Sequence, residues 1–155
     1  MNMKKMLITG VTSGMGKYLH EHLGGEGLTR KNAEKIFSEH KRFDAIIHCA
    51  YNSKREVNSE NLYSYVCDNI ALTEKLLDLP HKMFIFFSTV DVYPRAKGLH
   101  KEDEVIRLSD VTGMYAITKL ISESLVTNKG LPFMMSKNGP LRSVEPNIME
   151  ERTMQ

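Results

Sequence analysis

The chain has 155 residues, of which 41% are hydrophobic and 26% charged, and this length and composition are typical of one globular domain. Its net charge of +2 gives no indication of a nucleic-acid-binding or membrane-binding surface. The two cysteines, Cys49 and Cys67, are too few for a disulfide framework, and no apolar run reaches the roughly 18–20 residues of a membrane span. We therefore expect a cytoplasmic protein with one domain over residues 1–155, and no metal site is predicted.

The N-terminal stretch predicts a strand, a glycine-rich turn and a helix, over residues 5–9, 10–13 and 14–23. Glycines let the backbone turn tightly and let a phosphate approach closely, while the N-terminus of the helix presents free N–H groups to the anion. A turn that serves only packing is the alternative interpretation. The residues predicted to bind a phosphate-bearing cofactor here are Gly10, Thr12, Ser13, Gly14, Met15 and Gly16.

Strands and helices alternate along the rest of the chain. The predicted elements are a helix over 31–40 with Thr29 as its N-cap, a strand over 43–50, a helix over 59–77, a strand over 83–88, a polar loop over 91–113, a helix over 114–127, a strand over 131–135 and a loosely ordered tail over 136–155. Such alternation predicts right-handed crossovers and a doubly wound parallel sheet, an α/β fold of the Rossmann-like class.

Two further groups of residues carry possible chemistry. Tyr115 and Lys119 are four residues apart and so lie on one face of a helix. A nearby ammonium lowers the pKa of a phenol, which makes the pair a candidate for proton transfer; a surface tyrosine beside a solvated lysine is the alternative. Ser88 and Thr89 end a strand, where a hydroxyl can bind a substrate oxygen or simply cap the strand.

In their order along the chain, these segments resemble the short-chain dehydrogenase/reductase superfamily, and most of all its extended branch, the NAD-dependent epimerase/dehydratase family. The resemblance runs from Met6 to about Val126. Tyr115 and Lys119 match the Tyr-x-x-x-Lys pair of the family. The other matching segments are Asp44–Ala50, which resembles the strand along the cofactor, Asn69–Thr73, which resembles a helix with a buried asparagine, and Phe84–Tyr93.

The resemblance implies a role for each matching residue. Thr89 would polarise a substrate oxygen and Tyr115 would act as acid or base. Lys119 would bind the nicotinamide ribose and lower the pKa of Tyr115, and Asn69 would hold the local helix and a water molecule. Cys49 and Ala50 would lie along the cofactor, which would be NAD or NADP. The implied substrate is a nucleotide sugar or a related carbonyl or alcohol compound, and the family often dimerises through the helices represented here by 58–77 and 114–127.

The sequence also departs from the family pattern. The glycine spacing resembles the single-domain branch of the superfamily, and no apolar run between Leu23 and Leu28 could form the second strand, which normally ends in a ribose-binding acid. Glu26 is the only nearby acid. We therefore expect four or five strands, no full substrate-binding lobe and weak cofactor binding. Two functions stay open: an oxidoreductase, epimerase or dehydratase, and a shortened, non-catalytic relative that binds a nucleotide or a partner.

Overall fold

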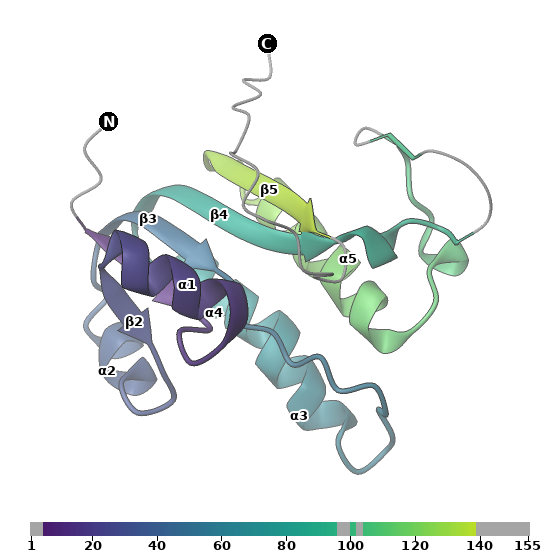
Figure 1. Ribbon diagram of the computed structural model, residues 1–155, viewed down its shortest axis with the longest axis horizontal. Coiled ribbons are helices and arrows are strands. Elements are labelled where there is room, and N and C mark those ends of the chain that lie inside the picture. The colour runs from purple at the N-terminus through teal and green to yellow at the C-terminus, as the bar shows by residue number, and fades with distance from the viewer. Residues whose placement is uncertain (1–4, 96–99, 102–103, 139–155) are drawn as a thin grey trace.

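Five parallel strands form the centre of the molecule in the order β2-β1-β3-β4-β5 (Figure 1). The computed structural model describes residues 5–95, 100–101 and 104–138. The strands are β1 (Met6–Thr9), β2 (Glu26–Leu28), β3 (Phe43–His48), β4 (His81–Thr89) and β5 (Phe133–Asn138). The predicted α/β, Rossmann-like sheet with a reduced number of strands is therefore confirmed.

The helices connect these strands as the alternation predicted. They are α1 (Gly14–Leu23), α2 (Ala33–Ser38), α3 (Leu62–Val66), α4 (Leu72–Asp78) and α5 (Met114–Asn128), with a π-helical segment η1 (Cys67–Ala71) between α3 and α4 and two 3-10 turns, η2 (Val90–Val92) and η3 (Leu108–Asp110). The predicted helix over 59–77 is thus a nearly continuous helical region that contains one widened turn, and such π-helical turns often occur at functional sites.

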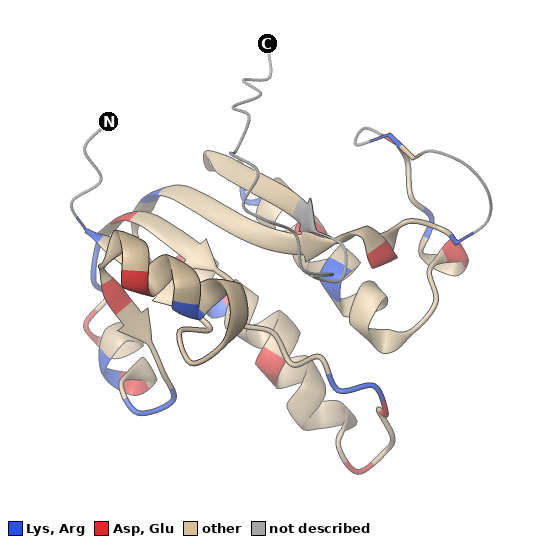
Figure 2. Ribbon diagram, in the orientation of Figure 1, with Lys and Arg blue, Asp and Glu red and all other residues tan. Residues whose placement is uncertain are grey.

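Side chains along the strands point alternately to the two faces of the sheet, and helices cover both faces. On one face, Leu7, Ile46 and Phe84 pack with apolar side chains of α2, α4 and α5. On the other face, Ile8 and Ile47 pack against Leu19 of α1. Figure 1 shows α1 in front of the sheet and α5 behind it. The charged residues lie mainly on the helices, the loops and the strand ends (Figure 2), as expected when the middle of a sheet is buried.

The prediction that no strand lies between Leu23 and Leu28 is wrong. β2 pairs in parallel with β1, and Leu28 lies opposite Thr9. This edge strand has three residues, of which only Leu28 is buried, so it needs no apolar run. Gly25, with a φ of 96°, turns the chain back directly after α1, and an added Cβ there would lie 3.0 Å from the Met6 carbonyl oxygen. Backbone pairing and a glycine turn form this strand, and neither gives a hydrophobic signal in the sequence.

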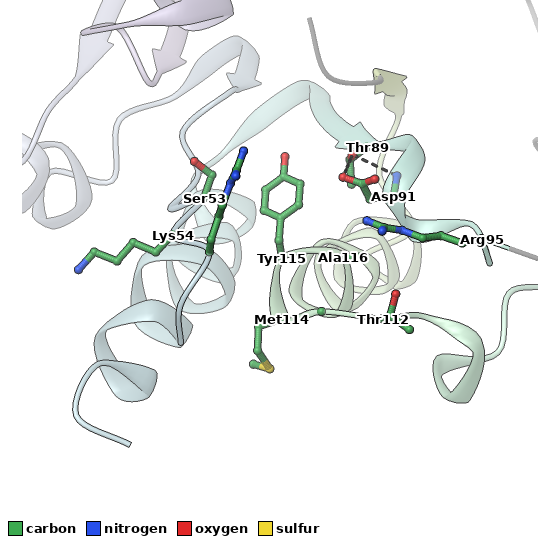
Figure 3. Close-up of a pocket in the computed structure, with 11 residues that line it drawn as sticks. Ser53, Lys54, Thr89, Asp91, Arg95, Thr112, Met114, Tyr115 and Ala116 are labelled. Atoms are coloured by element: carbon green, nitrogen blue, oxygen red, sulfur yellow. Dashed lines mark hydrogen bonds between the residues drawn. The ribbon is translucent and has the colours of Figure 1, made fainter. Parts of the chain in front are cut away.

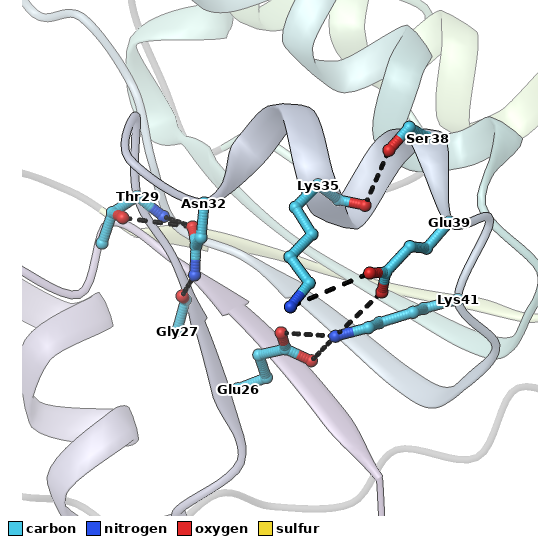
Figure 4. A network of polar contacts seen from close by, with 8 residues as sticks. All are labelled: Glu26, Gly27, Thr29, Asn32, Lys35, Ser38, Glu39 and Lys41. Carbon is cyan, nitrogen blue, oxygen red and sulfur yellow. Dashed lines mark hydrogen bonds and ion pairs between the residues drawn. The ribbon is translucent and has the colours of Figure 1, made fainter.

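The segment after β2 also differs from its prediction. Helix α2 begins at Ala33 rather than Lys31, and Thr29 is not its N-cap. The Asn32 side chain accepts a hydrogen bond from the Thr29 N–H at 2.8 Å and donates one to the Gly27 carbonyl oxygen at 2.8 Å (Figure 4). The Asn32 N–H also donates to the Thr29 carbonyl oxygen at 3.2 Å, so residues 29–32 form a closed turn and the helix begins only after it.

The end of the described chain is more regular than predicted. β5 continues through residues 136–138, which were expected to belong to a loosely ordered tail, because Ser136 and Asn138 pair with Phe87 and Thr89 of β4. The rest of that predicted tail, 139–155, lies outside the described residues. Among the described helices, none has the length and apolar character needed to cross a membrane.

Candidate functional site

The glycine loop after β1 is shaped by contacts that exclude side chains. Gly10 has a φ of 74°, and a Cβ on it would lie 2.9 Å from the Ala50 nitrogen. A Cβ on Gly16 would lie 2.5 Å from the Thr9 and Gly10 carbonyl oxygens. Helix α1 then begins without a side-chain cap from Ser13 and without an acidic residue in its first turn. Its first N–H groups therefore remain available to an anion.

A chain of buried hydrogen bonds fixes this loop to the end of β3. The Thr9 hydroxyl accepts from the N–H groups of Cys49 at 3.0 Å and Ala50 at 2.8 Å, so it donates to Nδ1 of His48 at 2.9 Å. Nε2 of His48 lies 3.0 Å from the Thr73 hydroxyl, which itself donates to the Asn69 carbonyl oxygen at 2.7 Å. His48 is therefore the Nε2–H tautomer, and burial, with the Lys119 charge as a smaller cause, lowers its pKa to about 3.

Asn69, predicted to hold its local helix, lies in the π-helical segment η1 and is fully buried. Its side-chain oxygen accepts from the Asn52 N–H at 2.7 Å, and its side-chain nitrogen donates to the Asn52 carbonyl oxygen at 3.0 Å. One side chain thus satisfies both backbone groups of a loop residue. This pair of bonds fixes the loop that follows β3, directly beside Cys49 and Ala50.

Lys119 does not face open space. Its side chain is 3% exposed, and Nζ donates to the Phe87 carbonyl oxygen of β4. Nζ also lies 3.7 Å from the ring centroid of Tyr51 and 4.7 Å from that of Phe86. Burial lowers the pKa of Lys119 to about 7, although the nearby Cys49 and Glu123 groups act in the opposite direction. The predicted ribose-binding amine is therefore covered by aromatic rings.

Tyr115 borders an open cavity of about 750 Å³ at the carboxyl ends of β3 and β4. Figure 3 shows its ring between the loop that carries Ser53 and the segment that carries Thr89 and Asp91, with Arg95 extending toward the same space. The remaining residues that line the cavity are Lys54, Arg55, Thr112, Gly113, Met114 and Ala116. Among the described residues, two guanidinium groups and one ammonium group thus border this space, and Asp91 is the acidic residue that lines it.

The electrostatics of Tyr115 differ from the expectation that Lys119 lowers its pKa. Burial raises the pKa of Tyr115, Asp91 raises it further, and the Thr89 hydroxyl opposes them. Lys119 is not among the causes of this shift, and its amine instead contacts the Tyr51 ring. In this arrangement the Tyr115 phenol is protonated at neutral pH and is suited to donate a proton.

The two strand-end hydroxyls have different partners. The Thr89 hydroxyl accepts a hydrogen bond from the Asp91 N–H at 3.2 Å and lines the cavity. The Ser88 hydroxyl instead donates to the Glu123 carboxylate on α5. The structure therefore brings Thr89 and Tyr115 to one cavity, and it brings Cys49 and Ala50 against the glycine loop. Lys119 and Asn69 are instead buried and do not line the cavity.

Two residues of this site were missed in the sequence. His48 is a single histidine at the end of an apolar strand, and nothing in the neighbouring sequence indicates that it has a role in a site. Tyr51 follows that strand directly and contacts Tyr115 edge to face, with ring centroids 5.6 Å apart. A bulky aromatic residue immediately after Ala50 was the one available clue, but the sequence does not show that it covers Lys119.

The adenosine end of the candidate cofactor site has no carboxylate where one was sought. β2 ends at Leu28 and is followed by Thr29 and Arg30. Glu26, considered as a substitute, is at the opposite end of the strand and pairs with Lys41 at 3.0 Å (Figure 4). It therefore cannot bind a ribose beside the glycine loop.

A sequence profile described as the NAD dependent epimerase/dehydratase family matches residues 6–135. The chain belongs to this family. No sequence among the curated proteins matches the chain significantly. The family assignment therefore rests on the profile, which covers every described strand apart from the end of β5.

Solved structures show the same fold at low sequence identity. UDP-N-acetylglucosamine 4-epimerase from Methanobrevibacter ruminantium, in complex with UDP-N-acetylmuramic acid, has a TM-score of 0.72 and 18% identity, covering 88% of this chain and 55% of its own. UDP-glucuronic acid 4-epimerase from Bacillus cereus, with UDP-glucuronic acid and NAD, has values of 0.68, 20%, 86% and 55%. For dTDP-4-dehydrorhamnose reductase from Yersinia enterocolitica the values are 0.70, 22%, 87% and 52%. The chain thus spans about half the length of these structures.

The residues present fit one half of an NAD molecule better than the other. The glycine loop, with its free helix N-terminus and its contact with Ala50, fits a pyrophosphate. At the nicotinamide end, Lys119 is buried under Tyr51 and bonded to Phe87, so a ribose cannot reach its amine in this arrangement.

Proposed function

We propose that the protein is an NAD-dependent oxidoreductase, epimerase or dehydratase that acts on a nucleotide sugar or a related carbonyl or alcohol compound. The observation that carries the proposal is the cavity at the carboxyl ends of β3 and β4, into which Thr89 and Tyr115 both contribute, beside a glycine loop that fits a pyrophosphate. Ligands of open α/β sheets bind at this edge. When bound, the cofactor would supply hydride transfer.

The protein's own residues would handle the proton. A protonated Tyr115 would donate to the oxygen of a bound carbonyl group, and Thr89 would hydrogen-bond to the same oxygen and orient it. Arg55 and Arg95 on the cavity wall are suited to anions, because a guanidinium binds a phosphate or carboxylate with two parallel hydrogen bonds. A nucleotide sugar carries such phosphates, so the charge of the cavity supports this substrate class.

A second candidate function, nucleotide binding without catalysis, is favoured by the covered state of Lys119. The two functions differ in what Tyr115 does. Under the first, Tyr115→Phe should remove nearly all turnover of NAD-linked reactions across a panel of nucleotide sugars and simple ketones. It should leave the dissociation constant of NAD almost unchanged, because the phenyl ring still packs against Tyr51.

Tyr18→Phe is the matched control, since Tyr18 is an exposed tyrosine on α1 and does not line the cavity. Equal turnover by wild type and Tyr115→Phe would contradict a catalytic role for Tyr115. NAD binding without turnover in the wild type would favour the second function. The homodimer expected from the helices over 58–77 and 114–127 stays a prediction, which sedimentation of the wild-type protein would test.

A further inference from the structure

Tyr51 lies at the nicotinamide end of the candidate cofactor site, where the residues present fit NAD poorly because Lys119 is buried. Tyr51 follows Ala50, whose backbone nitrogen lies so close to Gly10 that a side chain at Gly10 would clash with it. Its ring then contacts both residues of the Tyr-x-x-x-Lys pair, Lys119 at 3.7 Å and Tyr115 at 5.6 Å between ring centroids. The ring therefore packs against the buried lysine and against the tyrosine that borders the cavity.

We propose that Tyr51 limits dinucleotide binding: its ring occupies the approach to Lys119, and it must move before a nicotinamide ribose can bond to that amine. This inference rests on the proposed function, because it assumes that the glycine loop binds the pyrophosphate of NAD. A ribose hydroxyl has to come within about 3 Å of Nζ to form a hydrogen bond. Lys119 is 3% exposed, and its Nζ donates to a carbonyl oxygen and lies over two aromatic rings.

The ring is packed, but its hydroxyl is poorly bonded. The Tyr51 hydroxyl is buried and makes no hydrogen bond of ordinary geometry to any described residue. Thr118 and Ser122 lie close enough to lower its pKa, although burial raises the pKa overall. A buried hydroxyl without a well-formed hydrogen bond destabilises the covered arrangement, whereas the contact with the Lys119 ammonium stabilises it. The free energy of the arrangement in which Tyr51 covers Lys119 thus contains opposing contributions, and ligand binding can shift the equilibrium away from it.

The rest of the site would stay in place when the ring moves. The neighbouring Asn52 is fixed through its backbone by Asn69, and Ala50 is fixed by the Thr9 hydroxyl. A rotation of the Tyr51 side chain therefore needs no displacement of the loop backbone. The free energy of this rotation should therefore weaken the binding only of ligands that extend to Lys119. A ligand that ends at the pyrophosphate should bind equally well whether or not the Tyr51 ring is present.

Isothermal titration calorimetry with NAD and with ADP tests this. Tyr51→Ala should bind NAD about tenfold or more tightly than wild type, whereas ADP should bind both proteins equally. Tyr51→Phe keeps the ring over Lys119 and loses only the unpartnered hydroxyl, so it should bind NAD no more tightly than wild type. Tyr51→Leu provides a second shortened variant if the alanine variant folds poorly, and Tyr63→Ala controls for loss of an exposed tyrosine.

A second readout does not depend on NAD. Acetic anhydride labelling followed by mass spectrometry should modify Lys119 faster in Tyr51→Ala than in wild type or Tyr51→Phe. Equal NAD affinity in wild type and Tyr51→Ala, with ADP binding intact in both, would overturn the inference about Tyr51 alone. Failure of the wild type and of Tyr51→Ala to bind either ADP or NAD would instead refute the proposed function, and the inference with it.

Discussion

His48 should make the protein unusually sensitive to mild acid. Its ring is fully buried and hydrogen-bonded on both sides, by Thr9 at Nδ1 and by Thr73 at Nε2. Burial disfavours a charged ring, and the neighbouring Lys119 charge opposes a second positive charge. These causes lower the pKa of His48 to about 3, compared with an ordinary value of 6.5.

The direction and size of the effect follow from proton linkage. Below the ordinary pKa the unfolded chain takes up a proton at His48 while the folded protein does not, so acid favours unfolding. Stability should therefore fall as pH falls from about 6.5 toward the folded-state pKa of about 3. Between pH 7.0 and 4.5 this single residue should reduce the free energy of unfolding by roughly 2.5 kcal/mol. A change of that size corresponds to roughly 5–10 °C in melting temperature for a chain of this length.

Urea unfolding of wild type and His48→Gln at pH 7.0 and 4.5 would measure it. Other titrating groups affect both proteins alike, so the difference between the two pH-dependent losses isolates His48. The glutamine variant will be less stable at pH 7.0, but it should lose about 2.5 kcal/mol less than wild type on acidification. In Lys119→Met most of the pH dependence should persist, because burial is the larger cause of the shift. Equal losses in wild type and His48→Gln would show that His48 takes up its proton in the folded protein.

Two further predictions concern the glycine loop and the buried lysine. Gly16→Ala should lower the free energy of unfolding by at least about 2 kcal/mol, because the new Cβ would lie 2.5 Å from two carbonyl oxygens. Gly14→Ala, where the same atom meets open space, should cost about 1–2 kcal/mol for its positive φ alone; equal losses in urea unfolding would contradict this. Lys119 has a folded-state pKa of about 7, so its buried charge destabilises the wild type fully below pH 7 and progressively less as pH rises toward 10.5. Relative to Lys119→Met, the wild type should gain about 2 kcal/mol between pH 7 and pH 9, whereas the exposed Lys129→Met variant should follow the wild type; a parallel response of the wild type and Lys119→Met would refute the assignment.

Strong apolar periodicity made most of the fold predictable from the sequence. β3, β4 and α5 each bury several apolar side chains, and α1 starts and ends at the predicted residues. β2 was missed because backbone hydrogen bonds to β1 and the turn at Gly25 form it, and neither depends on hydrophobic side chains. The start of α2 was misplaced because the Asn32 side chain closes a turn over residues 27–32, which comes before the helix.

Only those parts of the candidate site that are formed by neighbouring residues in the sequence were predictable. The glycine loop is a local feature, and its spacing in the sequence indicated its conformation. The contact between Tyr51 and Lys119 joins residues far apart in the chain, and no local pattern records it. The expected lowering of the Tyr115 pKa by Lys119 was not found, because helical spacing places the two residues on one face but does not show that Tyr115 is partly buried beside Asp91.

The polar residues beneath the site explain why one end of it is rigid and the other adjustable. Thr9, His48 and Thr73 form a chain in which every acceptor has a donor, so moving any one of them would leave a buried group unpaired. That requirement fixes the end of β1 and the end of β3 relative to each other, and with them the glycine loop. The Tyr51 hydroxyl makes no hydrogen bond of ordinary geometry to a described residue, and its ring is held by packing and by the contact with Lys119. A ligand that needs the glycine loop therefore meets a preformed surface, whereas one that needs Lys119 must first displace a side chain.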